Sequence, residues 1–307
     1  MSSGEAEFAL CLTHDVDRPH KTYQAVYDAV RRRDPGALAP LVGEEDPYWQ
    51  FDAVTNIEAS HGVRSAFYVL NEPSLLAYAP RHWLDPRNWV EHLGRYDPTA
   101  PPMAETLRRL EAGGWEVGLH GSRMAATDPD RLAVECAALE SVLEGHVVGG
   151  RHHHLTLDQP ATWRTHVDCG LAYDASLGSA TPGFQHGYHL RQPFDDVEFV
   201  VFPLTLMEVG LPDPAESFEA AQSVCDDLMA EAAEHGGVMT VLWHPRYFHP
   251  EEFPGYRELY DWLLGAALDR GGWVGSPAEF LYRRESSDQD DETPDGPLAV
   301  PANTRVH

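Results

Sequence analysis

Lysine, paired cysteines and long apolar runs are all scarce in this chain of 307 residues. Lys21 is the only lysine, so nearly all of the positive charge is carried by arginine. The four cysteines lie far apart without a Cys-x-x-Cys pair, which argues against a zinc ribbon or a disulfide framework. No apolar run approaches the roughly 20 residues of a membrane helix, and the N-terminus lacks the features of a secretory signal. We therefore expect a soluble cytoplasmic protein.

Positive charge is also scarce relative to negative charge. The chain has 49 acidic and 22 basic residues, a formal net charge of −27, and such a surface repels nucleic acid and anionic membranes. The acidic residues are spread along the chain, so we interpret them as an adaptation to high salt, which screens their mutual repulsion. We expect a halophilic source and neither a nucleic-acid nor a membrane partner. Nothing in the sequence indicates a protein partner.

Short β-rich runs alternate with helical stretches along most of the chain. The expected strands are 8–13, 64–70, 115–120, 146–151, 198–206, 238–244 and 272–275. The expected helices are 23–33, 103–112, 129–143, 217–234 and 256–268. This alternation is typical of β/α units around a parallel sheet or barrel. We expect one domain over 1–285, a lid or substrate-facing loop at 34–50, and an acidic disordered tail at 286–307.

Several of the expected strands end in residues that bind metals or move protons. Asp15 and Asp17 close the first strand, and their i, i+2 spacing places both carboxylates on one face of it. Later strands end in His120, in the run Arg151-His-His-His154, and in His244. Because parallel α/β folds place their chemistry at the carboxyl ends of the strands, we expect these side chains to converge on one site.

In order and spacing these motifs resemble those of the polysaccharide deacetylases of the NodB-homology type, carbohydrate esterase family 4, over about residues 8–280. The resemblance implies a distorted (β/α) barrel with about seven parallel strands. It also implies a metal-dependent hydrolase that removes an acetyl group from the amide nitrogen of an N-acetylated sugar or polysaccharide. By this resemblance Asp15 is the catalytic base, while Asp17 and His120 are metal ligands.

The resemblance implies further roles around the same site. Arg151 orients the base, Asp174 pairs with Arg151, and His244 is the general acid that protonates the leaving nitrogen. The expected substrate contacts are Leu242, which lines the pocket for the acyl methyl group, together with Trp243 and His154.

The second metal-binding histidine of the family is replaced here by Met124. A thioether is a poor ligand for a hard or borderline divalent ion, so we expect Met124 to pack rather than ligate. His153 is our first choice for the missing ligand, because a strand-like alternation would turn it to the same side as Arg151. His152, His154 and water stay open as alternatives. Zinc suits a mixed Asp/His site, and cobalt or nickel would also fit.

Two other functions stay open at this point. A hydrolase of a different non-peptide carbon–nitrogen bond could use the same site on the same fold. A carbohydrate-binding module without catalytic activity could have kept the barrel and lost the metal. Metal content and a panel of acetylamino sugars and small amides would separate these possibilities.

Overall fold

The computed structural model describes residues 6–33, 35, 36, 38, 46–77 and 80–290. Its centre is a nine-stranded sheet in the order β6-β5-β4-β3-β2-β1-β8-β7, with β9 paired to β1. The strands are β1 Ala9–Val16, β2 Ala66–Leu70, β3 Glu116–Gly121, β4 Gly149–His152, β5 Tyr173–Asp174, β6 Val200–Val201, β7 Leu204–Met207, β8 Val238–Leu242 and β9 Trp273–Gly275. All of these strand pairs are parallel. The expected distorted (β/α) barrel is confirmed, with two more strands than expected.

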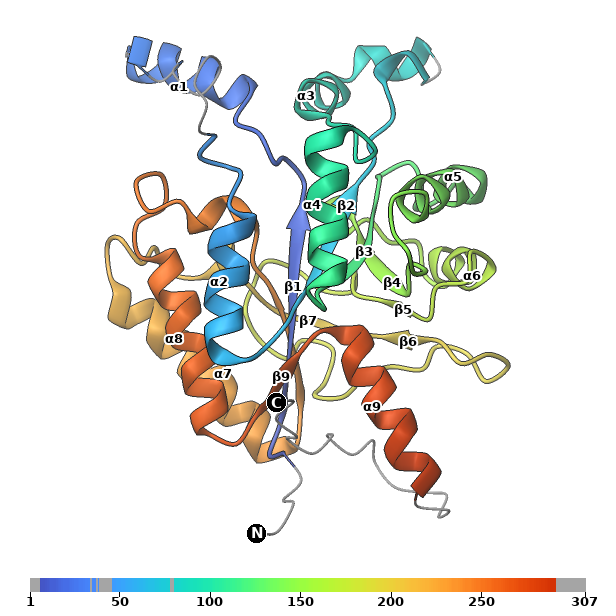
Figure 1. Ribbon diagram of the computed structural model, residues 1–307, viewed down its shortest axis with the longest axis vertical. Helices are drawn as coiled ribbons and strands as arrows, with labels where there is room; N and C mark the ends of the chain where they lie inside the picture. Colours follow the sequence, from blue (N-terminus) through green and yellow to red (C-terminus); the bar gives the residue numbers. More distant parts are fainter. Residues whose placement is uncertain (1–5, 34, 37, 39–45, 78–79, 291–307) are drawn as a thin grey trace.

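Helices surround the curled sheet (Figure 1). They are α1 Tyr23–Arg32, α2 Phe51–His61, α3 Pro86–Gly94, α4 Pro101–Ala112, α5 Pro129–Glu140, α6 Ala161–Asp168, α7 Phe218–His235, α8 Tyr256–Asp269 and α9 Pro277–Asp290. The five expected helices are α1, α4, α5, α7 and α8. None of the helices in the described ranges is long and apolar enough to cross a membrane. The start of the expected tail, 286–290, is the end of α9, and the rest of it lies outside the described residues.

The residues flanking the expected helices explain where these helices begin and end. Asp128 precedes α5 and accepts a hydrogen bond from the backbone N–H of Arg131, which satisfies a free donor of the first turn. Gly236 ends α7 with a φ of 58°, a left-handed conformation that glycine adopts without strain. The expected strand 198–206 is divided into β6 and β7 around Pro203, which has no N–H to donate to a ladder.

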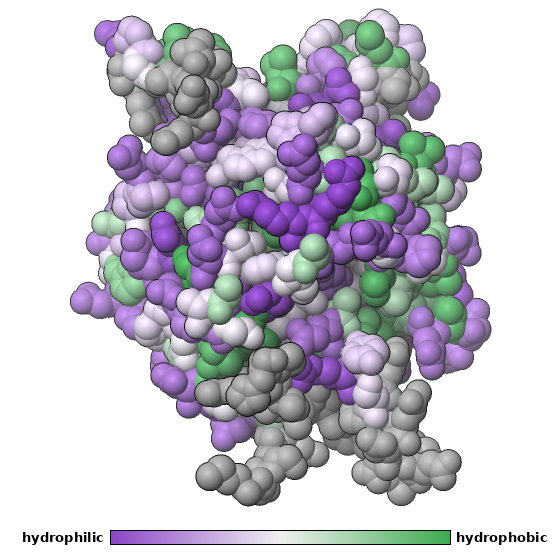
Figure 2. Space-filling model, in the orientation of Figure 1, coloured by the Kyte–Doolittle hydropathy of each residue, from purple (hydrophilic) through white to green (hydrophobic). Residues whose placement is uncertain are grey.

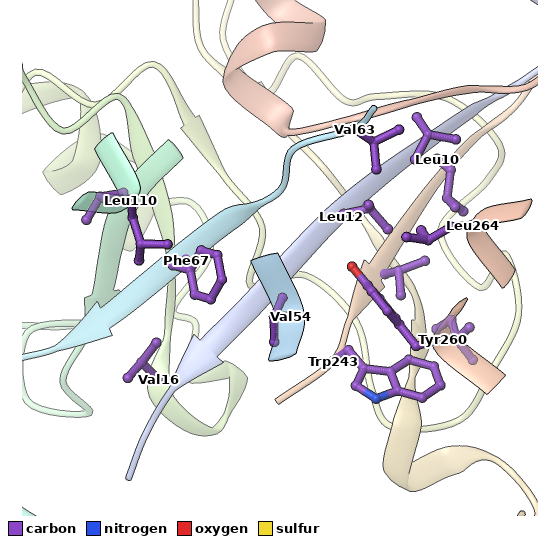
Figure 3. Packing of buried hydrophobic residues seen from close by; sticks show 14 of the residues in the cluster. Leu10, Leu12, Val16, Val54, Val63, Phe67, Leu110, Trp243, Tyr260 and Leu264 are labelled. Carbon is purple, nitrogen blue, oxygen red and sulfur yellow. The ribbon is translucent and has the colours of Figure 1, made fainter. Parts of the chain in front are cut away.

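The strand alternation in β1 assigns its residues to two sides of the sheet. Leu10 and Leu12 belong to the large hydrophobic cluster between the sheet and the helices, where they pack near Tyr260 of α8 (Figure 3). Ala9 and Cys11 belong to a second cluster inside the barrel. Because side chains alternate along a strand, this inner row continues at the carboxyl end of β1 with Thr13 and Asp15.

Trp243 belongs to the large outer cluster, which corrects our expectation that it contacts substrate. Its side chain is fully buried, and its ring lies 5.3 Å from that of Tyr260 and 6.2 Å from that of Tyr256 (Figure 3). Trp243 follows β8 directly, so the alternation that turns His244 toward the site turns Trp243 toward the helices.

The visible surface is dominated by hydrophilic side chains, with small scattered hydrophobic areas (Figure 2). The lobes that carry α1 and α3 stand apart at the end of the molecule toward which β1 points (Figures 1 and 2). A notch between these two lobes therefore leads toward the carboxyl ends of the central strands.

Candidate active site

The carboxyl ends of four strands bring the expected residues together around Asp17. Asp15 lies in β1 and Asp17 follows it, while His120 lies in β3. Arg151 lies in β4 and is in register with His120, so His153 emerges from the sheet beside His120. His244 follows β8, which pairs with β1. The parallel ladder thus places side chains that are far apart in the sequence at one edge.

Asp17 is the centre of this arrangement. Its Oδ1 lies 3.0 Å from Nε2 of His120 and 3.9 Å from Nε2 of His153, and its Oδ2 lies 3.2 Å from Nε2 of His244. Burial alone would raise the pKa of the Asp17 carboxyl. The neighbouring histidines, His244 and His120 above all, outweigh burial and hold this pKa well below its ordinary value.

Asp17, His120 and His153, which we call the metal triad, form a donor set that fits a divalent ion. Their ligand atoms lie within 4.8 Å of one another, and donors about 2.0–2.2 Å from a tetrahedral ion lie roughly 3.3–3.6 Å apart. His120 donates its Nδ1 proton to the carbonyl of Arg151 at 2.8 Å and its Nε2 proton to Oδ1 of Asp17 at 3.0 Å, so Nε2 is the nitrogen that would face an ion once that proton is lost. Burial lowers the pKa of His153 well below its ordinary value, which favours the neutral, ligating form.

The other candidates for the third ligand lie elsewhere. His152 turns away from Asp17, and its Nε2 lies 2.8 Å from Nε2 of the buried His166. His154 is exposed, with a left-handed φ of 58°, and its ring stacks on that of His153 at 3.9 Å. Met124 is half-buried and lies outside the hydrophobic clusters of the described residues. Of these alternatives within the described residues, His153 is the one that lies with Asp17 and His120, and its role as a ligand stays a prediction.

Asp15 and Arg151 form a buried ion pair next to the metal triad. Arg151 donates from one terminal nitrogen to Oδ1 of Asp15 and to Oγ1 of Thr13, both at 2.8 Å, and from Nε to the carbonyl of Ala175 at 2.8 Å. These three bonds fix the guanidinium. The other oxygen of Asp15 is 3.8 Å from Nε2 of His120 and faces the triad.

Asp174 does not form the expected pair with Arg151. Its carboxylate accepts hydrogen bonds from the backbone N–H and hydroxyl of Ser176 at 2.9 and 2.6 Å and from Nε1 of Trp163 at 3.1 Å. Ser176 in turn accepts the backbone N–H of His152 at 2.8 Å. Asp174 therefore supports the loop after β4 through Ser176, and this corrects the direct pairing inferred from the sequence.

His244 and Glu208 form a second pair, which lies at the other oxygen of Asp17: Nε2 of His244 is 3.2 Å from Oδ2 of Asp17. Nδ1 of His244 is 2.6 Å from Oε1 of Glu208, a buried carboxylate. Burial lowers the pKa of His244, but the charges of Glu208 and Asp17 outweigh it and raise this pKa to about 9. His244 is therefore protonated at neutral pH.

Known structures share this architecture over most of the chain. No protein-family model and no curated protein matches the sequence. A protein of Mycobacterium smegmatis, assigned by name as a polysaccharide deacetylase, superposes with a TM-score of 0.60 at 18% identity, covering 100% of this chain and 97% of that one. The allantoinase Puue superposes with a TM-score of 0.58 at 14% identity, covering 90% and 89%. The chain has the deacetylase-type barrel fold. At these identities the likeness concerns the fold alone.

Two residues of the site were not expected. Glu208 directly follows β7. The search for metal-binding or proton-moving residues at the ends of strands, which found Asp15 and His120, would therefore also have found Glu208. Arg246 lies two residues after His244, and one of its terminal nitrogens is 3.3 Å from Oδ2 of Asp17. No motif marked Arg246.

Two small hollows flank Asp17. The lining of the first hollow includes Asp15, Arg18, Tyr48 and Arg246. The lining of the second hollow includes Asp17, Arg18, Glu72 and Arg95. Tyr48 belongs to the segment 34–50 expected to face substrate, and part of this segment lies outside the described residues.

Two of the expected substrate contacts lie at the edges of the site. Leu242 ends β8 opposite Thr13 and is buried, so its contact with an acyl methyl group stays a prediction. The contact of the exposed His154 with substrate stays one as well.

Proposed function

We propose that this protein is a metal-dependent hydrolase that removes an acetyl group from the amide nitrogen of an N-acetylated sugar or glycan. The observation that carries the proposal is the metal triad with the Asp15–Arg151 pair and the His244–Glu208 pair next to it. The name of the Mycobacterium smegmatis protein, which shares the fold over the whole chain, supports the same class of reaction.

Each part of the site has a task in such a reaction. The metal triad would hold a divalent ion, for which we propose zinc, and that ion would supply the positive charge that polarises a carbonyl group and activates water. The free oxygen of Asp15 would take a proton from the attacking water, while Arg151 keeps the carboxylate in place. His244, protonated at neutral pH, would give its proton to the leaving nitrogen.

A hydrolase of another carbon–nitrogen bond is the second candidate. The allantoinase that shares the fold is named for a different class of substrate. A carbohydrate-binding module without activity is less favoured, because both the Asp15–Arg151 pair and the His244–Glu208 pair are present.

The test combines metal analysis with assays of acetate release. We expect one divalent ion per chain and acetate release from soluble N-acetylated sugars rather than from small cyclic amides. Asp15→Ala should abolish turnover with the metal retained, whereas Asp17→Ala and His153→Ala should release the metal. His152→Ala is the matched control and should retain it, because His152 faces His166.

The assays should be run in concentrated salt, because we propose that the net charge of −27 is an adaptation to it. A protein that holds no stoichiometric divalent ion and releases neither acetate nor any amide product after metal addition would contradict both enzymatic candidates. It would leave the binding module as the function.

A further inference from the structure

Three polar side chains are buried in the apolar layer between the sheet and the helices α2 and α8. They are His14 of β1, Glu58 of α2 and Tyr260 of α8, and all three are fully buried. The His14 ring packs 4.9 Å from the ring of Phe67, and Tyr260 lies beside Trp243 (Figure 3). Burying such groups costs free energy that apolar side chains in the same place would not cost. Packing alone therefore does not account for them.

Glu58 is held by hydrogen bonds at both carboxylate oxygens. Its Oε2 accepts from the hydroxyl of Ser65 at 2.9 Å and from Nε1 of Trp115 at 2.6 Å. Its Oε1 accepts from the hydroxyl of Tyr260 at 2.7 Å and lies 2.8 Å from Nε2 of His14. Because these contacts fix the carboxylate, Glu58 also fixes the orientation of the His14 ring.

The other ring nitrogen of His14 reaches the backbone of the neighbouring strand where the β1–β8 ladder ends. The ladder runs to the pairing of Thr13 with Leu242, and the N–H of Trp243 donates to the carbonyl of Thr13 at 3.0 Å. The carbonyl of Trp243 lies 2.5 Å from Nδ1 of His14. A carbonyl oxygen only accepts, so Nδ1 carries a proton and donates it. This side chain thus extends the connection between the two strands beyond their last pairing.

The two residues joined by this hydrogen bond each precede a residue of the site. His14 directly precedes Asp15, the proposed base, and Trp243 directly precedes His244, the proposed acid. The bond therefore ties together the two chain segments that carry these groups. A displacement of about 1 Å at a reaction centre can lower the rate about 10²-fold, so this tie bears on turnover.

We propose that His14 is a positioning residue for deacetylation, which holds Asp15 and His244 at their working separation and is itself oriented by Glu58. The proposal rests on the proposed function, because it concerns the base and the acid named there. His14 acts through the backbone of Trp243, from the outer side of the sheet, and does not touch the substrate.

Asparagine and glutamine at position 14 separate the tasks of the two ring nitrogens. The amide nitrogen of asparagine comes close to the position of Nδ1, and that of glutamine close to the position of Nε2. We expect His14→Gln to lower kcat for acetate release from N-acetylglucosamine at least tenfold with KM changed less than twofold. We expect His14→Asn to stay within threefold of the unchanged protein, because it keeps the donor to Trp243.

Ser65→Ala is the matched control for destabilisation. It removes a donor from Oε2 of Glu58, the oxygen that does not face His14. Urea unfolding should show a loss of stability. The kcat should nevertheless stay within twofold of the unchanged protein, because the bond from His14 to Trp243 is intact.

The leaving group separates positioning of the acid from general damage to the site. The nitrophenolate of 4-nitrophenyl acetate departs without a proton, whereas the amine of an N-acetylated sugar needs one. In His14→Gln the loss in kcat should therefore be at least fivefold larger for the sugar amide than for the ester. Equal losses for both substrates, or a loss in His14→Asn as large as in His14→Gln, would overturn the proposal.

The remaining outcomes separate this proposal from the proposed function. An unaltered kcat in His14→Gln would overturn the positioning role alone, whereas no acetate release from any amide by the unchanged protein would contradict the proposed function and the role with it. If His14→Gln does not fold, NMR of the unchanged protein labelled with ¹⁵N-histidine decides instead. A slowly exchanging proton on Nδ1 of His14, assigned by its loss in His14→Asn, is expected, and an unprotonated Nδ1 would overturn the proposal.

Discussion

Removal of the Arg151 guanidinium should destabilise the protein strongly, because it leaves a buried carboxylate without its partner. Both side chains of the Arg151–Asp15 pair are buried, at 0% and 4% exposure. Breaking a buried pair by removing one partner costs about 3–5 kcal/mol, more than the pair itself contributes. Arg151→Met also removes the bonds to Thr13 and Ala175. We therefore expect a loss of about 3–5 kcal/mol in the free energy of unfolding.

A double-mutant cycle isolates the part of this loss that comes from the unpaired charge. Asp15→Asn alone leaves the guanidinium unpaired, whereas Asp15→Asn combined with Arg151→Met leaves neither charge buried. We expect the double variant to be more stable than the sum of the two single losses predicts, by about 1–3 kcal/mol. Urea unfolding at constant salt, followed by fluorescence, gives the four free energies of the cycle, those of the unchanged protein and the three variants, and equal m values would show that the compared states are the same.

The outcome that refutes this reasoning is specific. If Arg151→Met lost less than about 1 kcal/mol, water would be solvating Asp15 and the pair would behave as a surface ion pair. If the two losses were additive, the two side chains would contribute through packing rather than through their charges. Either result would remove the reason to regard Arg151 as the residue that holds the base in place.

Three further predictions follow from single contacts. Glu208→Gln removes the charge that raises the pKa of His244 to about 9, so the basic limb of the pH–rate profile should move to lower pH by about one unit or more. Glu58→Gln should cost about 1–3 kcal/mol in urea unfolding, because the buried carboxylate accepts several hydrogen bonds that an amide cannot all accept. A Cβ on Gly150 would lie 1.9 Å from a backbone oxygen of β3, so Gly150→Ala should destabilise by several kcal/mol. By contrast, Gly170→Ala, with open space but a φ of 83°, should cost about 1 kcal/mol.

The sequence predicted the elements with strong local patterns and missed those whose formation depends on tertiary contacts. β1 begins with the apolar run Ala9–Leu12, and β8 is apolar except for Thr240, a pattern close to that of buried parallel strands. β5 has two residues, too few for any periodicity to appear. α2 was also missed, although it carries Glu58, because its first turn follows a loop without a capping side chain.

The site shows the same division between local patterns and tertiary contacts. Asp15, Asp17, His120 and His244 could be found because each ends a recognisable strand, and parallel strands end at one edge. The surroundings of Asp174 could not be found, because the hydrogen bonds of Ser176 and Trp163 depend on how the loops after β5 and β4 fold. Arg246 was missed for a similar reason, since only the packed structure brings it to Asp17.

The proposed metal site does not need a histidine at the position of Met124, because of how β3 and β4 pair. His120 is in register with Arg151, so the chain beyond β4 runs past His120, where a second ligand is needed. His153 stands two residues after Arg151 and faces the same side, and its ring lies 5.3 Å from that of His120. A ligand can therefore come from the neighbouring strand instead of from the turn after β3. If the proposed function is correct, the Arg151–His154 run would serve two tasks, since Arg151 would hold the base and His153 would complete the metal triad.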